Sequence, residues 1–204
     1  MDEYKTFAGV YDFLLFPVLH QIRLKTAKIV SQLNPEQIID LCCGTGNQLK
    51  YLKRKGFENI EGVDISHSML RQTRKGGAQI NCKHGDATKL NFPDNSFDTA
   101  LISFALHEKP LETAISIVKE AVRITRHGGH LLVVDYAFDS SVSPFVKTMV
   151  RIVERFAGKD HYRYFKNYIK HGGLESLFRN MEIMEEHRFH SGATRLRIYK
   201  IKNQ

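Results

Sequence analysis

Short apolar runs alternate with helical segments through the middle of this chain, and this alternation restricts the fold more than any other feature. Strands that are separated by helical crossovers lie parallel in one sheet, with helices covering both of its faces. The runs expected to form strands are Ile38–Cys42, Ile60–Ile65, Ile80–His84, Phe97–Phe104 and His130–Tyr136. The segments expected to form helices are Asn47–Lys55, Ser66–Lys75 and Leu111–Thr125. The sequence therefore predicts an α/β fold built on a mostly parallel sheet.

The two ends of the chain depart from this alternation. Near the C-terminus, Glu182–Phe189 and Arg195–Ile201 are β-like runs joined through Ser191-Gly192. No crossover fits between them, so they must form an antiparallel hairpin, which brings the expected number of strands to seven. At the other end, Tyr4–Leu33 is expected to form one or two helices split at Pro17. This N-terminal segment is either a face that packs on the core, or a lid or lipid-contacting surface.

Positive charge is concentrated in the last third of the chain. The formal net charge is +8, and residues 140–204 carry 13 Lys/Arg against 6 Asp/Glu, whereas residues 1–139 carry 17 against 16. Near the start of this basic region, a helix is expected to begin with Ser143 as its N-cap and Pro144 in its first turn. We expect one domain, residues 1–204, made of a helical lid (1–34), a core (35–139), a basic helical cap (140–180) and the terminal hairpin (181–204).

Several classes of protein are excluded by composition. The longest apolar run, Phe13–Leu19, has seven residues, whereas a membrane-spanning helix needs about 20. The N-terminus shows no basic leader before an apolar stretch, which argues against a secretory signal peptide. The three cysteines, Cys42, Cys43 and Cys82, are an odd number in a chain large enough to bury a core. No disulfide framework is therefore expected, and a reducing, cytoplasmic location is favoured.

A glycine-rich turn, Asp40–Gly46, follows the first expected strand and leads into a helix. This edge of an open α/β sheet is where ligands bind. Gly44 and Gly46 let the backbone approach a ligand, and the N–H groups at the start of the helix suit a phosphate or a carboxylate. Leu49 stands where the dinucleotide-binding pattern has glycine or alanine. A nicotinamide-dependent oxidoreductase is therefore a weakened alternative.

Two more acidic residues end the next two strands. Asp64 stands 24 positions after Asp40, close to the spacing of the acid that binds ribose hydroxyls in adenosine-containing cofactors. Asp86 follows the third strand, where a carboxylate can accept a hydrogen bond from the exocyclic amine of a base. Because parallel strands end at the same edge of a sheet, the three carboxylates are expected to meet there. The pattern predicts a site for an adenosine-containing cofactor.

Six motifs occur in order along residues 36–139: Asp40–Gly46, Val63–Ser66 with Ser68–Leu70, Gly85–Ala87, Phe92–Asp98, Ile102–Leu106, and Gly128–Gly129 before Leu131–Val134. In these motifs the chain resembles the class I S-adenosylmethionine-dependent methyltransferases, within the branch of ubiquinone/menaquinone-biosynthesis C-methyltransferases and small phospholipid N-methyltransferases. The resemblance implies a Rossmann-like sandwich of seven strands. It also implies S-adenosylmethionine as the cofactor and S-adenosylhomocysteine as its product.

The resemblance also implies roles for individual residues. Asp40 and the backbone of the glycine turn would hold the methionine part of the cofactor, and Asp64 would hold the ribose hydroxyls. Asp86 and the Ala87 amide would read the amine edge of adenine. Cys42 stands where the family has its first glycine. The other expected members of the site are Gly44 and Gly46, Ile65 and Met69 against adenine, Ser103 and Phe104 beside the sulfonium, and Tyr11 as a cover.

Methyl transfer from a sulfonium is an in-line displacement, so the protein has mainly to align the reactants and exclude water. If the acceptor needs a base, His107 after the fourth strand is the best-placed residue; the alternative is that it only packs at the cofactor rim. Tyr136, His161 and Tyr162 are expected to line the substrate pocket. His107 lacks the second histidine of a zinc-protease motif, and the cysteines lack paired zinc-ligand spacing. No metal is therefore expected.

The basic cap leaves the acceptor open. Its first helix combines a broad apolar face with Lys147, Arg151 and Arg155 at four-residue spacing. This pattern suits an anionic membrane, a solvated helix face, or RNA that stacks on neighbouring aromatic rings. We favour a small-molecule or lipid acceptor, a quinone precursor or a phospholipid amine, with peripheral membrane contact. The alternatives are a non-catalytic S-adenosylmethionine-binding regulator, an RNA methyltransferase and, last, an NAD-dependent oxidoreductase. The oligomeric state is left open.

Overall fold

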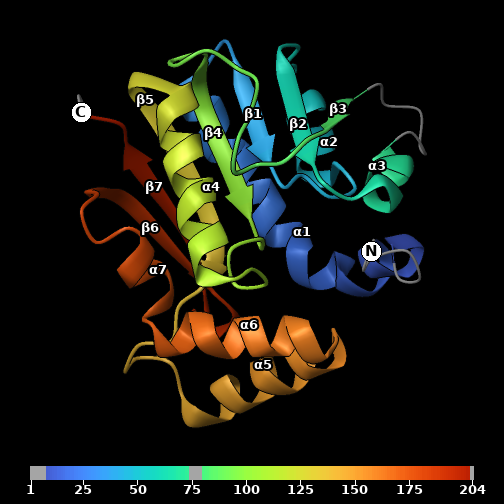
Figure 1. The fold of residues 1–204 in the computed structure, drawn as a ribbon, viewed down its shortest axis with the longest axis vertical. Helices are drawn as coiled ribbons and strands as arrows, with labels where there is room; N and C mark the ends of the chain where they lie inside the picture. Colours follow the sequence, from blue (N-terminus) through green and yellow to red (C-terminus); the bar gives the residue numbers. More distant parts are fainter. Residues whose placement is uncertain (1–7, 74–79, 203–204) are drawn as a thin grey trace.

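The computed structural model describes residues 8–73 and 80–202, without the side chains of residues 8–16 and 18. Its centre is a seven-stranded sheet with the strand order β3-β2-β1-β4-β5-β7-β6 (Figure 1). The strands are β1 (Ile38–Leu41), β2 (Ile60–Asp64), β3 (Asn81–His84), β4 (Phe97–Ser103), β5 (Thr125–Tyr136), β6 (Ile183–Phe189) and β7 (Thr194–Lys200). The helices are α1 (Ala8–Leu33), α2 (Asn47–Lys53), α3 (His67–Thr73), α4 (Leu111–Ile124), α5 (Pro144–Phe156), α6 (Lys159–Lys170) and α7 (Gly173–Leu177).

The predicted topology is confirmed. Strands β1 to β5 pair in parallel, and β6 and β7 form the antiparallel hairpin. The hairpin joins the sheet because β7 also pairs antiparallel with β5, from His130 opposite Lys200 to Tyr136 opposite Thr194. At the N-terminus, one helix covers the described part of the predicted segment and contains Pro17. In the cap, Ser143 is the N-cap of α5, since its side chain accepts a hydrogen bond from the Val146 N–H.

One boundary differs clearly from the prediction. The fifth strand begins at Thr125, not at His130, and follows α4 without a connecting loop. Gly128 and Gly129, which precede the predicted start of this strand, both form backbone hydrogen bonds with Ile201. The pairing with β4 shifts register between Phe97 and Thr99, so this glycine pair lies within an irregular start of the strand.

The core has two layers because the central strands are buried on both faces. Neighbouring residues of one strand contribute to opposite layers, as the period of two requires. Leu132 packs with α1 and α2 behind the sheet, while Leu131 and Val133 pack with α4 in front of it. This double burial explains why the strands are nearly continuous apolar runs.

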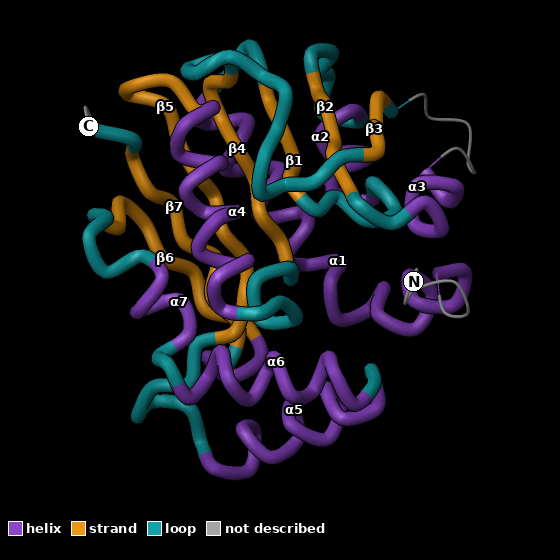
Figure 2. Tube along the Cα trace, in the orientation of Figure 1, coloured by secondary structure: helices purple, strands orange, loops and turns teal. Residues whose placement is uncertain are grey.

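Helices α5 and α6 lie across the edge where the parallel strands end (Figures 1 and 2). Of the two, α6 is next to the body of the molecule, where it contacts α4 and α7, and α5 packs on α6. Phe165 and Tyr168 of α6 are buried, and Tyr168 donates a hydrogen bond to the carbonyl of Tyr136. Among the described helices, none is both long and apolar enough to cross a membrane.

Gly62 generates a prediction about the packing around the glycine turn. It pairs with Asp40 across β1 and β2, and a Cβ there would lie 2.7 to 2.9 Å from side-chain atoms of Leu49, Cys43 and Cys82. Gly62→Ala should therefore lower the free energy of unfolding by about 1–3 kcal/mol. Glu61→Ala, on the same strand, should change it by less than about 0.5 kcal/mol. Chemical denaturation measures both values, and equal effects of the two substitutions would contradict the packing argument.

Candidate functional site

A pocket of about 400 Å³ opens at the carboxyl edge of the sheet, between the ends of β1, β2, β3 and β4 and the side of α1. Its volume suits a ligand of cofactor size. Of the twelve residues predicted to bind the cofactor, the ten that line the pocket are Asp40, Cys42, Gly44, Asp64, Ile65, Met69, Asp86, Ala87, Ser103 and Phe104. Gly46 does not line it, and the side chain of Tyr11 lies outside the described part of the chain.

The glycine turn has left-handed backbone at three positions: φ is 59° at Cys42, 55° at Gly44 and 69° at Gly46. Only Cys42 has a Cβ, which costs about 1–2 kcal/mol in this region. A Cβ at Gly44 would meet nothing within 4 Å, because this residue faces the pocket. A Cβ at Gly46 would lie 3.2 Å from Thr73 and 3.3 Å from Cys82, so Gly46 allows the start of α2 to pack closely. Burial raises the pKa of the Cys42 thiol, so the reactive thiolate is disfavoured.

The Asp64 carboxylate connects the two loops that form the pocket floor. Its Oδ2 accepts a hydrogen bond of 2.7 Å from the Gly44 N–H, and its Oδ1 accepts one of 2.8 Å from the Ser66 N–H. Burial raises its pKa, although these two N–H groups act in the opposite direction. Each carboxylate oxygen can accept more than one hydrogen bond, so Asp64 retains acceptor capacity for ligand hydroxyls.

Asp40 is the most unusual group in the pocket. Its side chain is 2% exposed, and its Oδ1 has no hydrogen-bond partner among the described residues. Burial, together with the nearby Asp64 carboxylate, raises the pKa of Asp40 to about 8, although Arg23 opposes the shift. A buried, unsatisfied carboxylate is costly and marks a place for a cationic ligand group. The ammonium group of S-adenosylmethionine has the charge and the hydrogen-bond donors that this position lacks.

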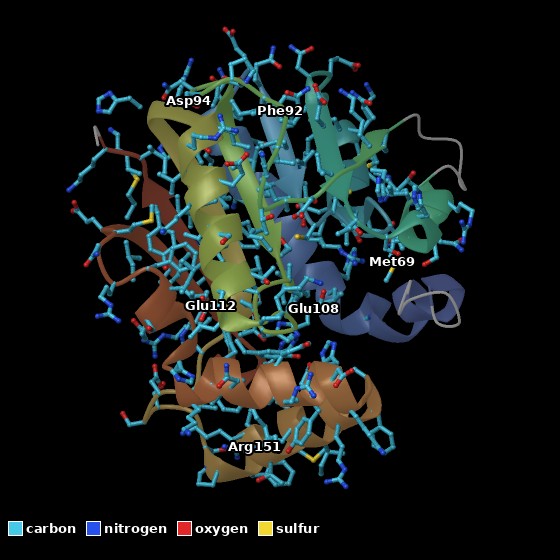
Figure 3. The ribbon with its side chains drawn as sticks, viewed as in Figure 1. Met69, Phe92, Asp94, Glu108, Glu112 and Arg151 are labelled. Carbon is cyan, nitrogen blue, oxygen red and sulfur yellow. The ribbon has the colours of Figure 1, made fainter. Side chains whose placement is uncertain are left out.

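The opposite end of the pocket suits a flat apolar ring. Ile65 is 60% exposed although it is a large apolar side chain, and Met69 lies nearby in the pocket lining. Figure 3 shows Met69 on α3, at the side of the pocket away from Glu108. Asp86 accepts hydrogen bonds from the N–H and hydroxyl of Thr88, which fixes the loop after β3. Adenine would cover Ile65 and lie beside Asp86, as the resemblance implies.

The residues predicted for chemistry lie beside the pocket. His107, Tyr136, His161 and Tyr162 are not among the described residues that line it. Three of them meet at the buried Glu154 of α5: its Oε1 accepts a hydrogen bond of 2.8 Å from the Tyr136 hydroxyl, and its Oε2 lies 2.5 Å from His161 and 3.5 Å from His107. Tyr162 instead stacks against Phe165 within α6.

Asp135 at the end of β5 orients His107. Its Oδ1 lies 2.7 Å from Nδ1 of His107, and its Oδ2 accepts the N–H groups of Leu106 and His107. Burial by itself would lower the pKa of His107, but the Asp135 and Glu154 carboxylates outweigh it and hold this pKa well above its usual value. The imidazoles of His107 and His161 lower the pKa of Glu154, although burial of this carboxylate acts in the opposite direction.

Sequence reasoning missed several pocket residues. Arg23 of α1 and the Glu108-Lys109 pair after β4 line the pocket, and Glu108 accepts a hydrogen bond of 2.7 Å from Lys109. Figure 3 shows Glu108 between the sheet edge and α6. Leu19 and Ile22 of α1 line the pocket as well as pack in the core. The position of Glu108 next to His107 was the available signal.

Asp40→Asn should have opposite effects on the stability of the unliganded protein and on its affinity for the ligand. The unfolded chain loses the Asp40 proton near pH 3.8, whereas the folded protein keeps it until about pH 8. The carboxylate therefore makes the unliganded protein less stable as the pH rises through this window, and the variant lacks this loss. We expect the Tm difference, variant minus wild type, to become more positive from pH 5 to pH 8.

The same substitution should weaken S-adenosylmethionine binding at least tenfold, because the ammonium loses its anionic partner. Thermal unfolding without ligand and isothermal titration calorimetry measure the two effects. A Tm difference that does not change with pH would contradict the raised pKa, and unchanged affinity would contradict the ammonium assignment.

Comparison with known proteins agrees with this geometry. A family described as a methyltransferase domain matches residues 39–133. The chain is 31% identical over 134 residues to a demethylmenaquinone methyltransferase of Bacillus licheniformis, which covers 63% of this chain and 57% of that protein. It is 26% identical over 196 residues to the Bacillus subtilis protein of the same name, which covers 90% and 80% of the two chains. The chain spans less than two thirds of the length of most of the first curated relatives that it matches.

A solved structure from Thermotoga maritima, described as an S-adenosylmethionine-dependent methyltransferase and possible histamine N-methyltransferase, has a similar fold. The TM-score is 0.66 at 22% identity, with 98% of each chain covered. This likeness shows the fold alone. The family match, the curated relatives, the strand order and the pocket at the end of β1 agree. In residues 39–133, in its strand order and in the pocket at the end of β1, the chain is similar to the class I S-adenosylmethionine-dependent methyltransferases.

Proposed function

We propose that this protein transfers a methyl group from S-adenosylmethionine to an apolar acceptor, a quinone precursor or a phospholipid amine, which it meets at an anionic membrane surface. The observation that carries the lipid part is the exposed apolar face of α5. The names of the demethylmenaquinone methyltransferases that the chain resembles support the quinone class. The pocket supports use of the cofactor through Asp40, Asp64 and Ile65.

Most apolar side chains of α5 face away from the body of the molecule. Phe145 is 72% exposed and Phe156 is 84% exposed, whereas Glu154 is the one buried residue among those of α5. At 100° per residue, the exposed apolar residues fall within an arc of about 100° on one side of the helix. They are Phe145, Met149, Ile152, Val153 and Phe156. Such a continuous apolar face on an outer helix indicates an interaction surface.

Positive charge borders this apolar face. Lys147, Arg151 and Arg155 follow one another on the flank between the exposed face and the buried Glu154. Arg151 lies over the ring of Phe138, with 5.6 Å from its guanidinium carbon to the ring centroid, and Figure 3 shows it on α5. Apolar residues beside cations are typical of helices that lie in the interface of an anionic membrane. This arrangement favours a membrane over RNA as the partner of this surface, because RNA bound to the cations would leave the exposed phenylalanine side chains of α5 in water.

Bound S-adenosylmethionine supplies an electrophilic methyl group on its sulfonium. The residues of the chain would position it: Asp40 at the ammonium, Asp64 at the ribose, and Ile65 against adenine. Ser103 and Phe104 line the pocket at the end of β4, where the sulfonium and the acceptor would meet. The left-handed backbone of Phe104, with φ of 52°, is held by a hydrogen bond from its N–H to the Val134 carbonyl. These residues act by alignment and by exclusion of water.

Transfer of a labelled methyl group tests the reaction. The protein is incubated with methyl-labelled S-adenosylmethionine and a cell extract, which is then separated into lipid, RNA, protein and small-molecule pools. We expect label in the lipid pool, and at least a tenfold loss with Asp64→Asn, which should keep its far-UV circular dichroism. Label in RNA would contradict the lipid assignment, and cofactor binding with no label in any pool would favour the regulator.

Vesicle flotation tests the membrane surface. Wild-type protein should float with anionic vesicles, float less at 0.5 M NaCl, and stay unbound with zwitterionic vesicles, because its cations need an anionic partner. Phe156→Ser should reduce flotation at least fivefold. Ile115→Ser is the matched control, since Ile115 is an exposed apolar residue that belongs to α4 and not to α5. Equal flotation of wild type and Phe156→Ser, or equal recovery with both kinds of vesicle, would contradict the proposal.

A further inference from the structure

Two histidines and two glutamates from distant parts of the chain converge behind the pocket wall. His107, Glu108 and His161 each offer a ligand atom within 4.8 Å of the other two. Glu154 joins them through its Oε2, at 2.5 Å from Nε2 of His161 and 3.5 Å from Nε2 of His107. Nδ1 of His161 lies 3.6 Å from Oε2 of Glu108. The four side chains are between 5% and 16% exposed.

The surrounding residues leave these ligand atoms directed at one another. Asp135, which is fully buried, holds Nδ1 of His107 and so turns its Nε2 toward Glu154. The Tyr136 hydroxyl donates to Oε1 of Glu154, and Lys109 donates to Oε1 of Glu108. In both glutamates the other oxygen, Oε2, faces an imidazole. A carboxylate behind each histidine, Asp135 at His107 and Glu154 at His161, and a fixed second oxygen on the Glu108 carboxylate are the supports that metal sites use.

The spacing also suits a metal ion. Two ligands at about 2.1 Å from a tetrahedral ion lie about 3.4 Å apart. The contact of 3.6 Å between Nδ1 of His161 and Oε2 of Glu108 has about that length, and it is long for a hydrogen bond. The contact of 2.5 Å between Glu154 and Nε2 of His161 would remain on metal binding, because it uses the other ring nitrogen. Two imidazoles with one carboxylate, and a water in the fourth position, are a donor set for Zn²⁺ and other divalent first-row transition metals.

We propose that His107, Glu108 and His161 form a binding site for a divalent transition metal ion of the zinc type, in which Glu154 is a positioning residue that holds His161 from behind. The site lies at the junction of the β4–α4 loop with α5 and α6, and Glu108 also lines the pocket. An ion there would fix α6 directly, and α5 through Glu154, to the loop that forms one wall of the pocket. The proposal does not depend on which acceptor is methylated.

Metal binding to the purified full chain tests this site. The protein is stripped with a chelator, titrated with Zn²⁺ by calorimetry, and analysed for bound metal after dialysis. We expect one ion per chain and a higher Tm with Zn²⁺. With Co²⁺ we expect visible absorption bands of a tetrahedral site. His161→Ala should weaken Zn²⁺ binding at least tenfold, and so should Glu108→Gln, which preserves the shape of the side chain.

His171→Ala is the matched control, because His171 is an exposed residue at the end of the same helix. It should bind Zn²⁺ as the wild type does. Wild-type protein without bound metal, or equal Zn²⁺ affinity in wild type and His161→Ala, would overturn the proposal. The exposed rings of His67 and His84 stack at 3.9 Å. Zn²⁺ that is lost with His84→Ala but kept with His161→Ala would also overturn it.

Discussion

The carboxylate of Asp64 is the contact on which the cofactor pocket depends. It ends β2 and accepts the N–H groups of Gly44 and Ser66, so one buried group fixes the turn after β1 and the start of the loop before α3. Without it, two backbone donors near the pocket would lose their partner, and the glycine turn would lose its support from the neighbouring strand. Asp40 at the end of β1 and Cys42 in the turn line the same pocket.

Several residues that lower the free energy of unfolding lie along the carboxyl edge of the parallel strands. Asp40 is buried with an oxygen that lacks a partner, and Cys42 and Phe104 adopt left-handed backbone despite their side chains. Strained backbone and unpaired buried groups are kept where the surrounding structure holds them in place and where function requires them. Strand β5 supplies this support. Its Asp135 carboxylate accepts hydrogen bonds from the N–H groups of Leu106 and His107, and its Val134 carbonyl accepts one from the Phe104 N–H. These bonds hold the loop after β4. The packed core thus offsets the loss of stability that these residues cause at the edge of the sheet.

The sequence predicted the sheet and the meeting of the three acids because both follow from local patterns, whereas the resemblance implied most of the other residues that line the pocket. A parallel strand places its last residues at a known edge, so Asp40, Asp64 and Asp86 could be brought together without coordinates. Arg23 and Glu154 could not be placed in this way, since their positions depend on how α1 and α5 pack against the rest of the fold. His107 and His161 stand 54 positions apart, and a cluster built across such a separation leaves no spacing motif. Periodicity found the apolar face of α5, but only its exposure showed that this face is not core.

Calorimetry of S-adenosylmethionine binding at pH 7, in two buffers with different ionisation enthalpies, tests the central claim most directly. Asp40 is expected to be mostly protonated before binding, since its pKa is about 8. An ammonium placed beside it favours the carboxylate. The account predicts S-adenosylmethionine binding, release of close to one proton per molecule bound, and no comparable binding of NAD. Preferential binding of NAD, or S-adenosylmethionine binding with the same heat in both buffers, would contradict it.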